Sequence, residues 1–207
     1  MEANIIYNID CLTGLRNLPD DSIDCCVTSP PYFNLRDYGV SGQIGLEDTP
    51  EQYIQKLVGV FHEVRRVLAP AGTLWVNIGD CYAGSGKGAA NYPDNAMKYK
   101  QGTNRGTVGR SAIVKKFDGY KSKDLIGIPW MLAFALRADG WFLRQDIIWA
   151  KPNPMPESMK DRCTKSHEYI FLLTKSPKYY FDCEAIHEKA VTSGTIPTNA
   201  PRYGGNK

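Results

Sequence analysis

Residues 27–33, VTSPPYF, are the stretch from which the rest of this chain is best understood. They begin at the last residue of a mostly apolar run over residues 23–27, which is typical of a short β-strand. Each proline fixes its backbone φ at about −65° and donates no amide hydrogen bond. We therefore expect the carbonyls of Ser29 and Pro30 to be unpaired acceptors beside a hydroxyl group and an aromatic ring. This rigid turn predicts a receptor for a planar ring that bears an amino group.

The same residues resemble the signature of the DNA amino-methyltransferases, (Asp/Asn/Ser)-Pro-Pro-(Tyr/Phe), which follows the fourth strand of that family. Ser29, preceded by an apolar residue and threonine, is similar to the cytosine-N4 branch, whereas adenine-N6 enzymes more often have aspartate there. The resemblance implies methyl transfer from S-adenosyl-L-methionine to the N4 amine of cytosine in double-stranded DNA. Adenine-N6 methylation is the alternative. It also implies a restriction-modification system with a restriction endonuclease as a partner.

Catalysis is assigned by this resemblance to the turn itself, Ser29, Pro30, Pro31 and Tyr32. The exocyclic amine of cytosine is a poor nucleophile because its lone pair is delocalised into the ring. An enzyme must therefore hold the nitrogen toward tetrahedral geometry with two acceptors. We assign Ser29 Oγ and the Pro30 carbonyl to the two amino hydrogens, so that transfer depends on positioning and needs no covalent intermediate.

A base inside a duplex cannot reach such a turn, so the target must be flipped out and stacked on an aromatic surface. Tyr32 is the expected platform, and Phe33 and Asn34 are expected at the pocket wall. For Phe33, packing into the core is an equally open alternative. The resemblance places Asp10 near the adenine or ribose of S-adenosylmethionine, and a helix N-cap is the alternative role of this residue.

Hydrophobic periodicity predicts an α/β sheet with covering helices, and the resemblance identifies it as part of a Rossmann-like S-adenosylmethionine-dependent methyltransferase fold. Thr49, followed by proline and by Gln52, predicts a capping box at the start of an amphipathic helix, which the Pro-Ala-Gly of residues 70–72 should end. The nearly continuous apolar run 73–78 is typical of a strand covered on both faces. Further strands are expected at residues 5–9, 23–27, 141–149 and 169–173, and further helices at residues 12–18 and 128–138.

The segment 87–123 differs in composition from the rest of the chain. It holds nine lysines and arginines against two acidic residues, whereas the whole chain has a net charge of +3. Aromatic residues and glycines interrupt the basic residues, a pattern that favours a loop that binds phosphates and stacks on bases. An ordinary solvated loop is the alternative. The lysines expected to contact DNA are Lys115, Lys116, Lys121 and Lys123.

The overall composition, 43% hydrophobic and 23% charged, is that of an ordinary globular chain. Its longest uncharged apolar run, residues 128–136, is too short for a membrane span and contains Pro129, so we expect a cytoplasmic protein. The six cysteines form no Cys-x-x-Cys pair, and no metal site is expected. The nucleophilic Pro-Cys dipeptide of cytosine-C5 methyltransferases does not occur, so methylation is expected at nitrogen.

The order of the motifs resembles the permuted beta class of these methyltransferases, but the glycine-rich cofactor loop of that class does not occur in the sequence. We therefore expect residues 1–181 to form the catalytic half of a methyltransferase domain and residues 182–207 to begin a further segment. A fragment of a longer enzyme is the favoured interpretation, and a second polypeptide that supplies the other half is the alternative. On this view the isolated chain neither binds S-adenosylmethionine tightly nor methylates DNA, and an inactive DNA-binding fragment is a third interpretation.

Overall fold

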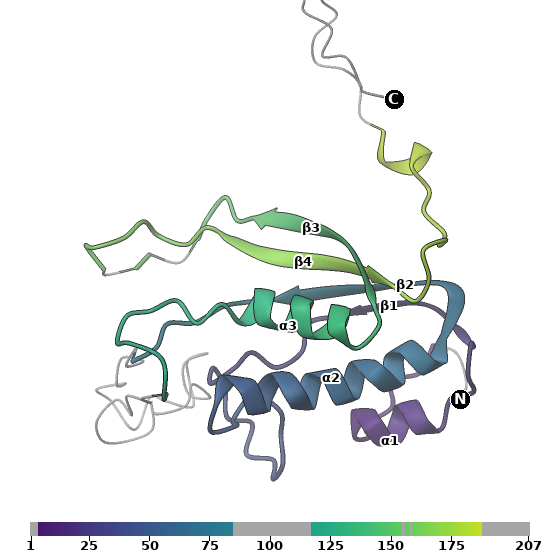
Figure 1. Cartoon of the computed structure of the whole chain (residues 1–207), viewed down its shortest axis with the longest axis horizontal. Helices are drawn as coiled ribbons and strands as arrows, with labels where there is room; N and C mark the ends of the chain where they lie inside the picture. The colour runs from purple at the N-terminus through teal and green to yellow at the C-terminus, as the bar shows by residue number, and fades with distance from the viewer. Residues whose placement is uncertain (1–3, 85–116, 155, 158, 188–207) are drawn as a thin grey trace, which may run out of the picture.

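A four-stranded sheet with three α-helices on one face makes up the protein (Figure 1), in a computed structural model that describes residues 4–84, 117–154, 156–157 and 159–187. All counts here refer to these residues. In chain order the elements are α1 (Cys11–Arg16), β1 (Ile23–Thr28), α2 (Pro50–Val67), β2 (Leu68–Ile78), α3 (Ile128–Ala138), β3 (Phe142–Ala150), β4 (His167–Thr174) and a 3₁₀ turn, Glu184–Ile186. The predicted α/β sheet is thereby confirmed.

The strand order is β1-β2-β4-β3, with β1 parallel to β2 and β4 antiparallel to both of its neighbours. Because β4 runs the opposite way, its first residues lie at the same end of the sheet as the last residues of β1 and β2. Three segments therefore meet at this end of the sheet: the turn at residues 29–32, the loop after β2 and the start of β4.

The amphipathic helix α2 begins as its sequence predicts. The Thr49 side chain accepts a hydrogen bond from the Gln52 backbone N–H at 3.2 Å, and Pro50 occupies the first turn. The Gln52 side chain accepts from Asp48 rather than from Thr49, so the predicted capping box is closed one residue earlier. The helix ends at Val67, shortly before the residues 70–72 that were expected to stop it, because Leu68 already has extended backbone angles and begins β2 by pairing with Ile23.

The other predicted elements differ from the structure mostly at their ends. Helix α3 has the predicted bounds, and α1, β1, β3 and β4 are each displaced or extended by one or two residues. The strand predicted at residues 5–9 is wrong: these residues have no regular structure, and Ile6 is 98% exposed. A strand needs a neighbour for its backbone groups, and no described strand pairs with this segment.

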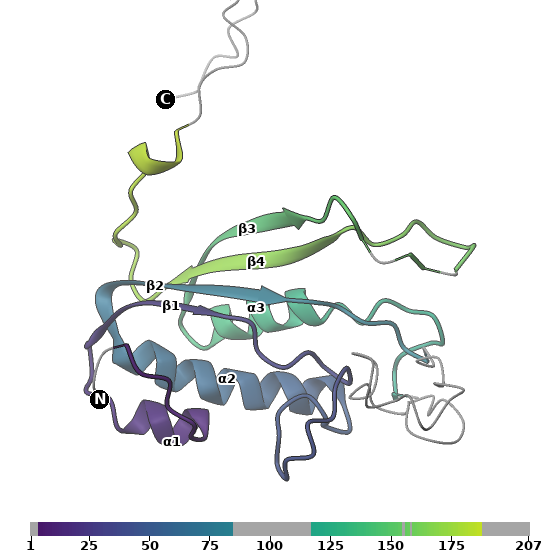
Figure 2. The same ribbon diagram turned by 180° about the vertical axis from the view of Figure 1, so that it is seen from behind.

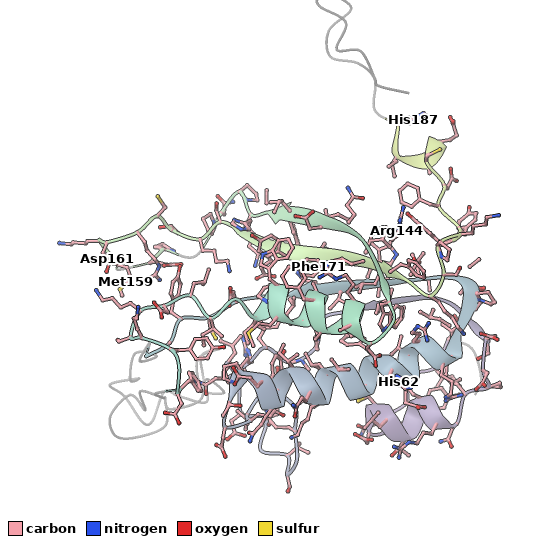
Figure 3. All side chains as sticks on the ribbon, viewed as in Figure 1. His62, Arg144, Met159, Asp161, Phe171 and His187 are labelled. Carbon is pink, nitrogen blue, oxygen red and sulfur yellow. The ribbon has the colours of Figure 1, made fainter. Side chains whose placement is uncertain are left out.

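The hydrophobic core lies between the sheet and the helices. Leu74, Val76 and Ile78 of β2 are all fully buried toward α2 and α3, and Phe171 lies between β4 and α3 (Figure 3). The opposite side of the sheet, here called the open face, carries no α-helix of the described residues (Figure 2). The prediction that residues 73–78 are covered on both faces is therefore only half right, because Asn77 on the open face is partly exposed.

Within the described ranges, no helix combines the length and the apolar character needed to cross a lipid bilayer. All six cysteines are free thiols.

Candidate active site

The Ser-Pro-Pro-Tyr turn begins where β1 ends at Thr28. Pro30 is buried, whereas Ser29 and Pro31 are exposed. The Tyr53 hydroxyl of α2 donates to the Pro31 carbonyl at 2.8 Å and ties the turn to the helix layer. In the part of the chain that the structure describes, no donor reaches the carbonyls of Ser29 and Pro30. The two acceptors expected from the prolines thus remain available.

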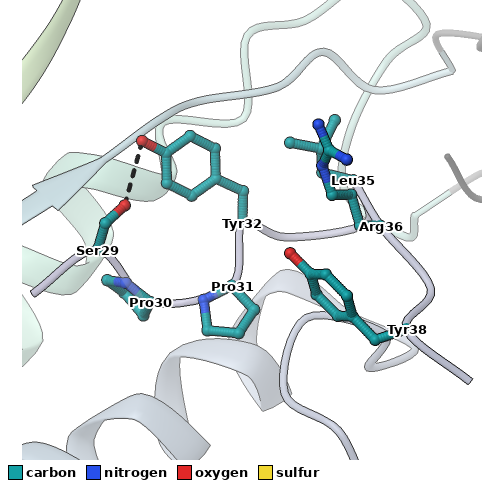
Figure 4. Close-up of a pocket in the computed structure, with 7 residues that line it drawn as sticks. All are labelled: Ser29, Pro30, Pro31, Tyr32, Leu35, Arg36 and Tyr38. Atoms are coloured by element: carbon teal, nitrogen blue, oxygen red, sulfur yellow. Dashed lines mark hydrogen bonds between the residues drawn. The ribbon is translucent and has the colours of Figure 1, made fainter. Parts of the chain in front are cut away.

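An open pocket of about 360 Å³ lies against this turn. Beyond the turn it is lined by the side chains that follow it, shown in Figure 4. Arg36 supplies a guanidinium group, and Tyr38, which is 55% exposed, supplies an aromatic ring in addition to that of Tyr32. The sequence reasoning missed Arg36 and Tyr38, although a cation and an aromatic residue directly after the turn were a usable signal. The lining residues are Ser29, Pro30, Pro31, Tyr32, Leu35, Arg36 and Tyr38.

The Tyr32 hydroxyl lies at the centre of a polar network on the open face. It is 2.9 Å from Asn77 Oδ1 and 2.9 Å from Glu168 Oε2. Ser29 Oγ lies 3.4 Å from the same Asn77 oxygen and 3.5 Å from the Tyr32 hydroxyl, the contact drawn in Figure 4. The Tyr32 ring packs on the backbone of Gly79, where a Cβ atom would lie 2.6 Å from Tyr32 Cε2. Both the ring and the hydroxyl of Tyr32 are therefore held.

Lys151, directly after β3, forms an ion pair with Glu168. Burial alone would raise the pKa of the Glu168 carboxyl, but hydrogen bonds from Lys151 and Tyr32 outweigh burial and lower this pKa below its ordinary value. Glu168 is therefore ionised at neutral pH. Burial is the main cause that raises the pKa of the Tyr32 phenol to about 12; the contact with Ser29 lowers this pKa, and the hydrogen bond and charge of Glu168 raise it further, so Tyr32 keeps its proton.

Asn77, Lys151 and Glu168 were also missed by the sequence reasoning. The available signal was a polar residue inside the apolar run of β2 and a carboxylate at the start of the apolar β4. Neither marks a site unless it is known that β4 pairs with β2 in the antiparallel sense. That pairing places Asn77 opposite Ile170, two residues from Glu168 on the same face.

Phe33 and Asn34 do not line the pocket. Phe33 is 2% exposed, and its ring centroid lies 5.3 Å from that of Tyr53 and 5.4 Å from that of Phe117. Of the two roles expected for Phe33, the structure shows packing into the core. Asn34 has a left-handed φ of 52°, and its backbone N–H donates to the Gly45 carbonyl at 2.6 Å, so it shapes the turn that leads away from the site.

Asp10 is the N-cap of α1, and its Oδ1 accepts from the Thr13 backbone N–H at 3.0 Å. This hydrogen bond lowers the pKa of the exposed Asp10 carboxyl. A second cavity, of about 300 Å³, begins at the neighbouring Cys11 and shares residues 29–31 with the first pocket. Its remaining walls are mostly apolar side chains from α1, β1 and α2, including Leu15, Cys26, Leu57, Phe61 and Val64.

Of the four lysines expected to contact DNA, Lys115 and Lys116 lie outside the described residues. Lys121 is exposed, and the Lys123 ammonium pairs with Asp161 at 2.7 Å at the tip of the β3–β4 loop (Figure 3). Phe117 packs on Phe33, the residue directly after the turn.

The family model N6_N4_Mtase, described as DNA methylase, matches residues 23–196. The type II methyltransferase M.Cfr9I of Citrobacter freundii is 52% identical over 189 residues, which cover 91% of this chain and 60% of that protein. The chain belongs to this DNA methylase family. It spans about 60% of the length of its curated relative.

Two solved structures share the fold. The PvuII DNA methyltransferase, named as cytosine-N4-specific, superposes with a TM-score of 0.55 at 17% identity and covers 85% of this chain and 50% of that chain. A putative DNA modification methylase of Thermus thermophilus, complexed with S-adenosyl-L-methionine, superposes with a TM-score of 0.52 at 22% identity and covers 85% and 55%. The fold class expected from the sequence is thereby confirmed.

Proposed function

We propose that this chain supplies the target-base pocket and the amine-binding turn of a DNA methyltransferase that modifies the N4 amine of cytosine. The observation that carries the proposal is that the carbonyls of Ser29 and Pro30 accept no hydrogen bond from the described residues, and that they lie beside the Ser29 hydroxyl and an open pocket with two tyrosine rings. These groups are acceptors arranged for a planar ring with an amino group.

In the proposed reaction, Ser29 Oγ and the Pro30 carbonyl accept the two hydrogens of the amine. Holding both hydrogens makes the nitrogen more pyramidal, which withdraws its lone pair from delocalisation into the ring and aims it at the methyl donor. The amine nitrogen would gain the methyl group as the methyl–sulfonium bond breaks, and it would lose one proton to solvent at the exposed turn. Because the nitrogen itself is the nucleophile, no protein nucleophile is needed.

The base must leave the duplex to enter this pocket. Tyr32 and Tyr38 offer aromatic surfaces that replace part of the stacking lost on flipping, and Arg36 offers a cation for a neighbouring phosphate. Lys121 and the other lysines of the 87–123 segment would contribute contacts to the DNA backbone that do not depend on base sequence.

The residues present fit one part of S-adenosylmethionine. The exposed, ionised Asp10 carboxylate suits the ribose hydroxyls or the adenine amine, and the apolar cavity that begins at Cys11 suits the adenine ring. When bound, this cofactor supplies an electrophilic methyl group on a sulfonium. Support comes from the Thermus methylase solved with this ligand. The cavity and the base pocket share residues 29–31, where donor and acceptor would have to meet.

Cytosine is preferred over adenine for two reasons. The first residue of the signature is serine, and the PvuII enzyme with the same fold is named as cytosine-N4-specific. Adenine-N6 methylation is the alternative. The type II relative supports a role in a cytoplasmic restriction-modification system, with a restriction endonuclease as the partner.

The test uses a chimera, because this chain spans only about 60% of the length of M.Cfr9I and the chimera contains the remainder of that relative. A chimera in which this chain replaces the matching segment of M.Cfr9I is incubated with S-adenosylmethionine and DNA, and the DNA is digested to nucleosides. The unaltered relative is the control. We expect N4-methylcytosine. N6-methyladenine would assign the alternative, and a folded chimera that methylates neither base would refute the proposal.

A further inference from the structure

The polar network behind the turn connects three strands to the proposed amine-binding group. We propose that Glu168, oriented by Lys151, is a positioning residue that sets the direction of the hydrogen bonds around Tyr32. As a result, Ser29 keeps its acceptor lone pairs for the hydrogens of the target amine. This inference rests on the proposed function and adds residues that lie outside the pocket.

The direction of these hydrogen bonds is set first by Lys151, because an ammonium group only donates and an ionised carboxylate only accepts. Lys151 donates to Glu168 Oε1 and leaves Glu168 Oε2 facing the Tyr32 hydroxyl at 2.9 Å. The Glu168 side chain is only 18% exposed, so water does not compete strongly for it. Hydrogen bonds to a charged acceptor are the stronger ones. The single Tyr32 hydroxyl hydrogen therefore points to Glu168.

This choice leaves Asn77 Oδ1 without the Tyr32 hydrogen. The orientation of the Asn77 amide is itself set, because Nδ2 donates to the Tyr169 carbonyl at 3.1 Å. Asn77 Oδ1 then faces Ser29 Oγ at 3.4 Å and takes the Ser29 hydrogen. A hydroxyl has one hydrogen and two lone pairs. With its hydrogen directed to Asn77, Ser29 presents lone pairs to the pocket, which is what a receptor for an amine hydrogen requires.

Glu168→Gln is the most informative variant, because it reverses the direction of the hydrogen bond to Tyr32 with almost no change in side-chain volume. Lys151 still claims Oε1, so the atom that faces Tyr32 becomes an amide nitrogen that donates. The Tyr32 hydrogen must then turn to Asn77 Oδ1, which lies 2.9 Å from the Tyr32 hydroxyl and 3.4 Å from Ser29 Oγ. Ser29 becomes the weaker of two donors to that oxygen, so its hydrogen is no longer fixed away from the pocket. In the chimera that contains the full chain, we expect kcat to fall roughly tenfold, the size of one misdirected hydrogen bond, with little change in KM for DNA.

The matched control is Glu63→Gln. Glu63 lies on α2, pairs with Arg66 at 3.0 Å and is 22% exposed, so it is a carboxylate of similar burial far from the turn. Its kcat should equal that of the unmodified chimera. A double-mutant cycle gives the second arm: Tyr32→Phe removes the phenol that transmits the effect, so Glu168→Gln should cost nothing further in that background.

A readout that needs no catalysis separates this inference from the proposed function. In the chain with ¹³Cζ-labelled tyrosine, the Tyr32 pKa of about 12 should fall in Glu168→Gln and stay above its ordinary value, because burial remains. An unchanged Tyr32 pKa overturns the inference even if the chimera is inactive. An unchanged kcat in Glu168→Gln, or an equal loss with and without the phenol, overturns it in an active chimera.

Discussion

The two faces of the sheet hold very different side chains, although they alternate along the same strands. On β2, Leu74, Val76 and Ile78 are fully buried against the helices, while Trp75 and Asn77 face the other way and are partly exposed. The helix-covered face is apolar, whereas the open face carries the network around Tyr32. Because side chains alternate along a strand, one strand serves both the core and the site. Substitutions on the helix-covered face should therefore lower stability, whereas substitutions at the network on the open face should lower activity.

The largest effect is expected from Leu74→Ala. Leu74 is fully buried at the centre of the helix-covered face, so its truncation removes apolar contacts and leaves a cavity. The free energy of unfolding should fall by about 2–5 kcal/mol, measured by urea denaturation. Val27→Ala on the open face is the control: Val27 is 78% exposed and should change stability by less than about 0.5 kcal/mol. Equal losses for both variants would end the distinction between the faces.

Ser29→Ala should have the opposite profile. Ser29 is exposed and contributes little to the core, so the urea midpoint should be unchanged. In the chimera, turnover should fall by about 100-fold, as when one positioned polar group is removed from an active site. DNA affinity should change little, since phosphate contacts supply most of it. Weakened DNA binding with normal turnover would contradict the role given to the hydroxyl.

The smallest effect is expected on the affinity for DNA. Replacing Lys115, Lys116, Lys121 and Lys123 with alanine should weaken binding to all sequences alike and flatten the slope of log affinity against log salt, by up to about 0.9 for each phosphate that is no longer neutralised. Because Lys123 already pairs with Asp161, Lys121→Ala alone should change the slope more than Lys123→Ala alone. An unaltered slope in the fourfold variant would identify this charge as solvating only.

Local patterns predicted the elements whose signals are local. The two prolines, the N-cap at Thr49 and the apolar spacing of α2 and α3 each lie within a few residues, and each is found in the structure. Glu168 could not be predicted in this way, because its meeting with Tyr32, 136 residues earlier in the chain, depends on the antiparallel placement of β4. The burial of Phe33 likewise depends on a residue far away in the sequence, Phe117.

The close approach of Tyr32 to Gly79 links two positions that are far apart in the sequence. A side chain at residue 79 and an aromatic ring at residue 32 would compete for the same space, since a Cβ there would lie 2.6 Å from the ring. The two positions should therefore vary as a pair rather than independently among related chains. A library of the chimera, randomised at both positions and selected for methylation, should return glycine at 79 whenever 32 is aromatic, and larger residues at 79 only beside a smaller side chain at 32.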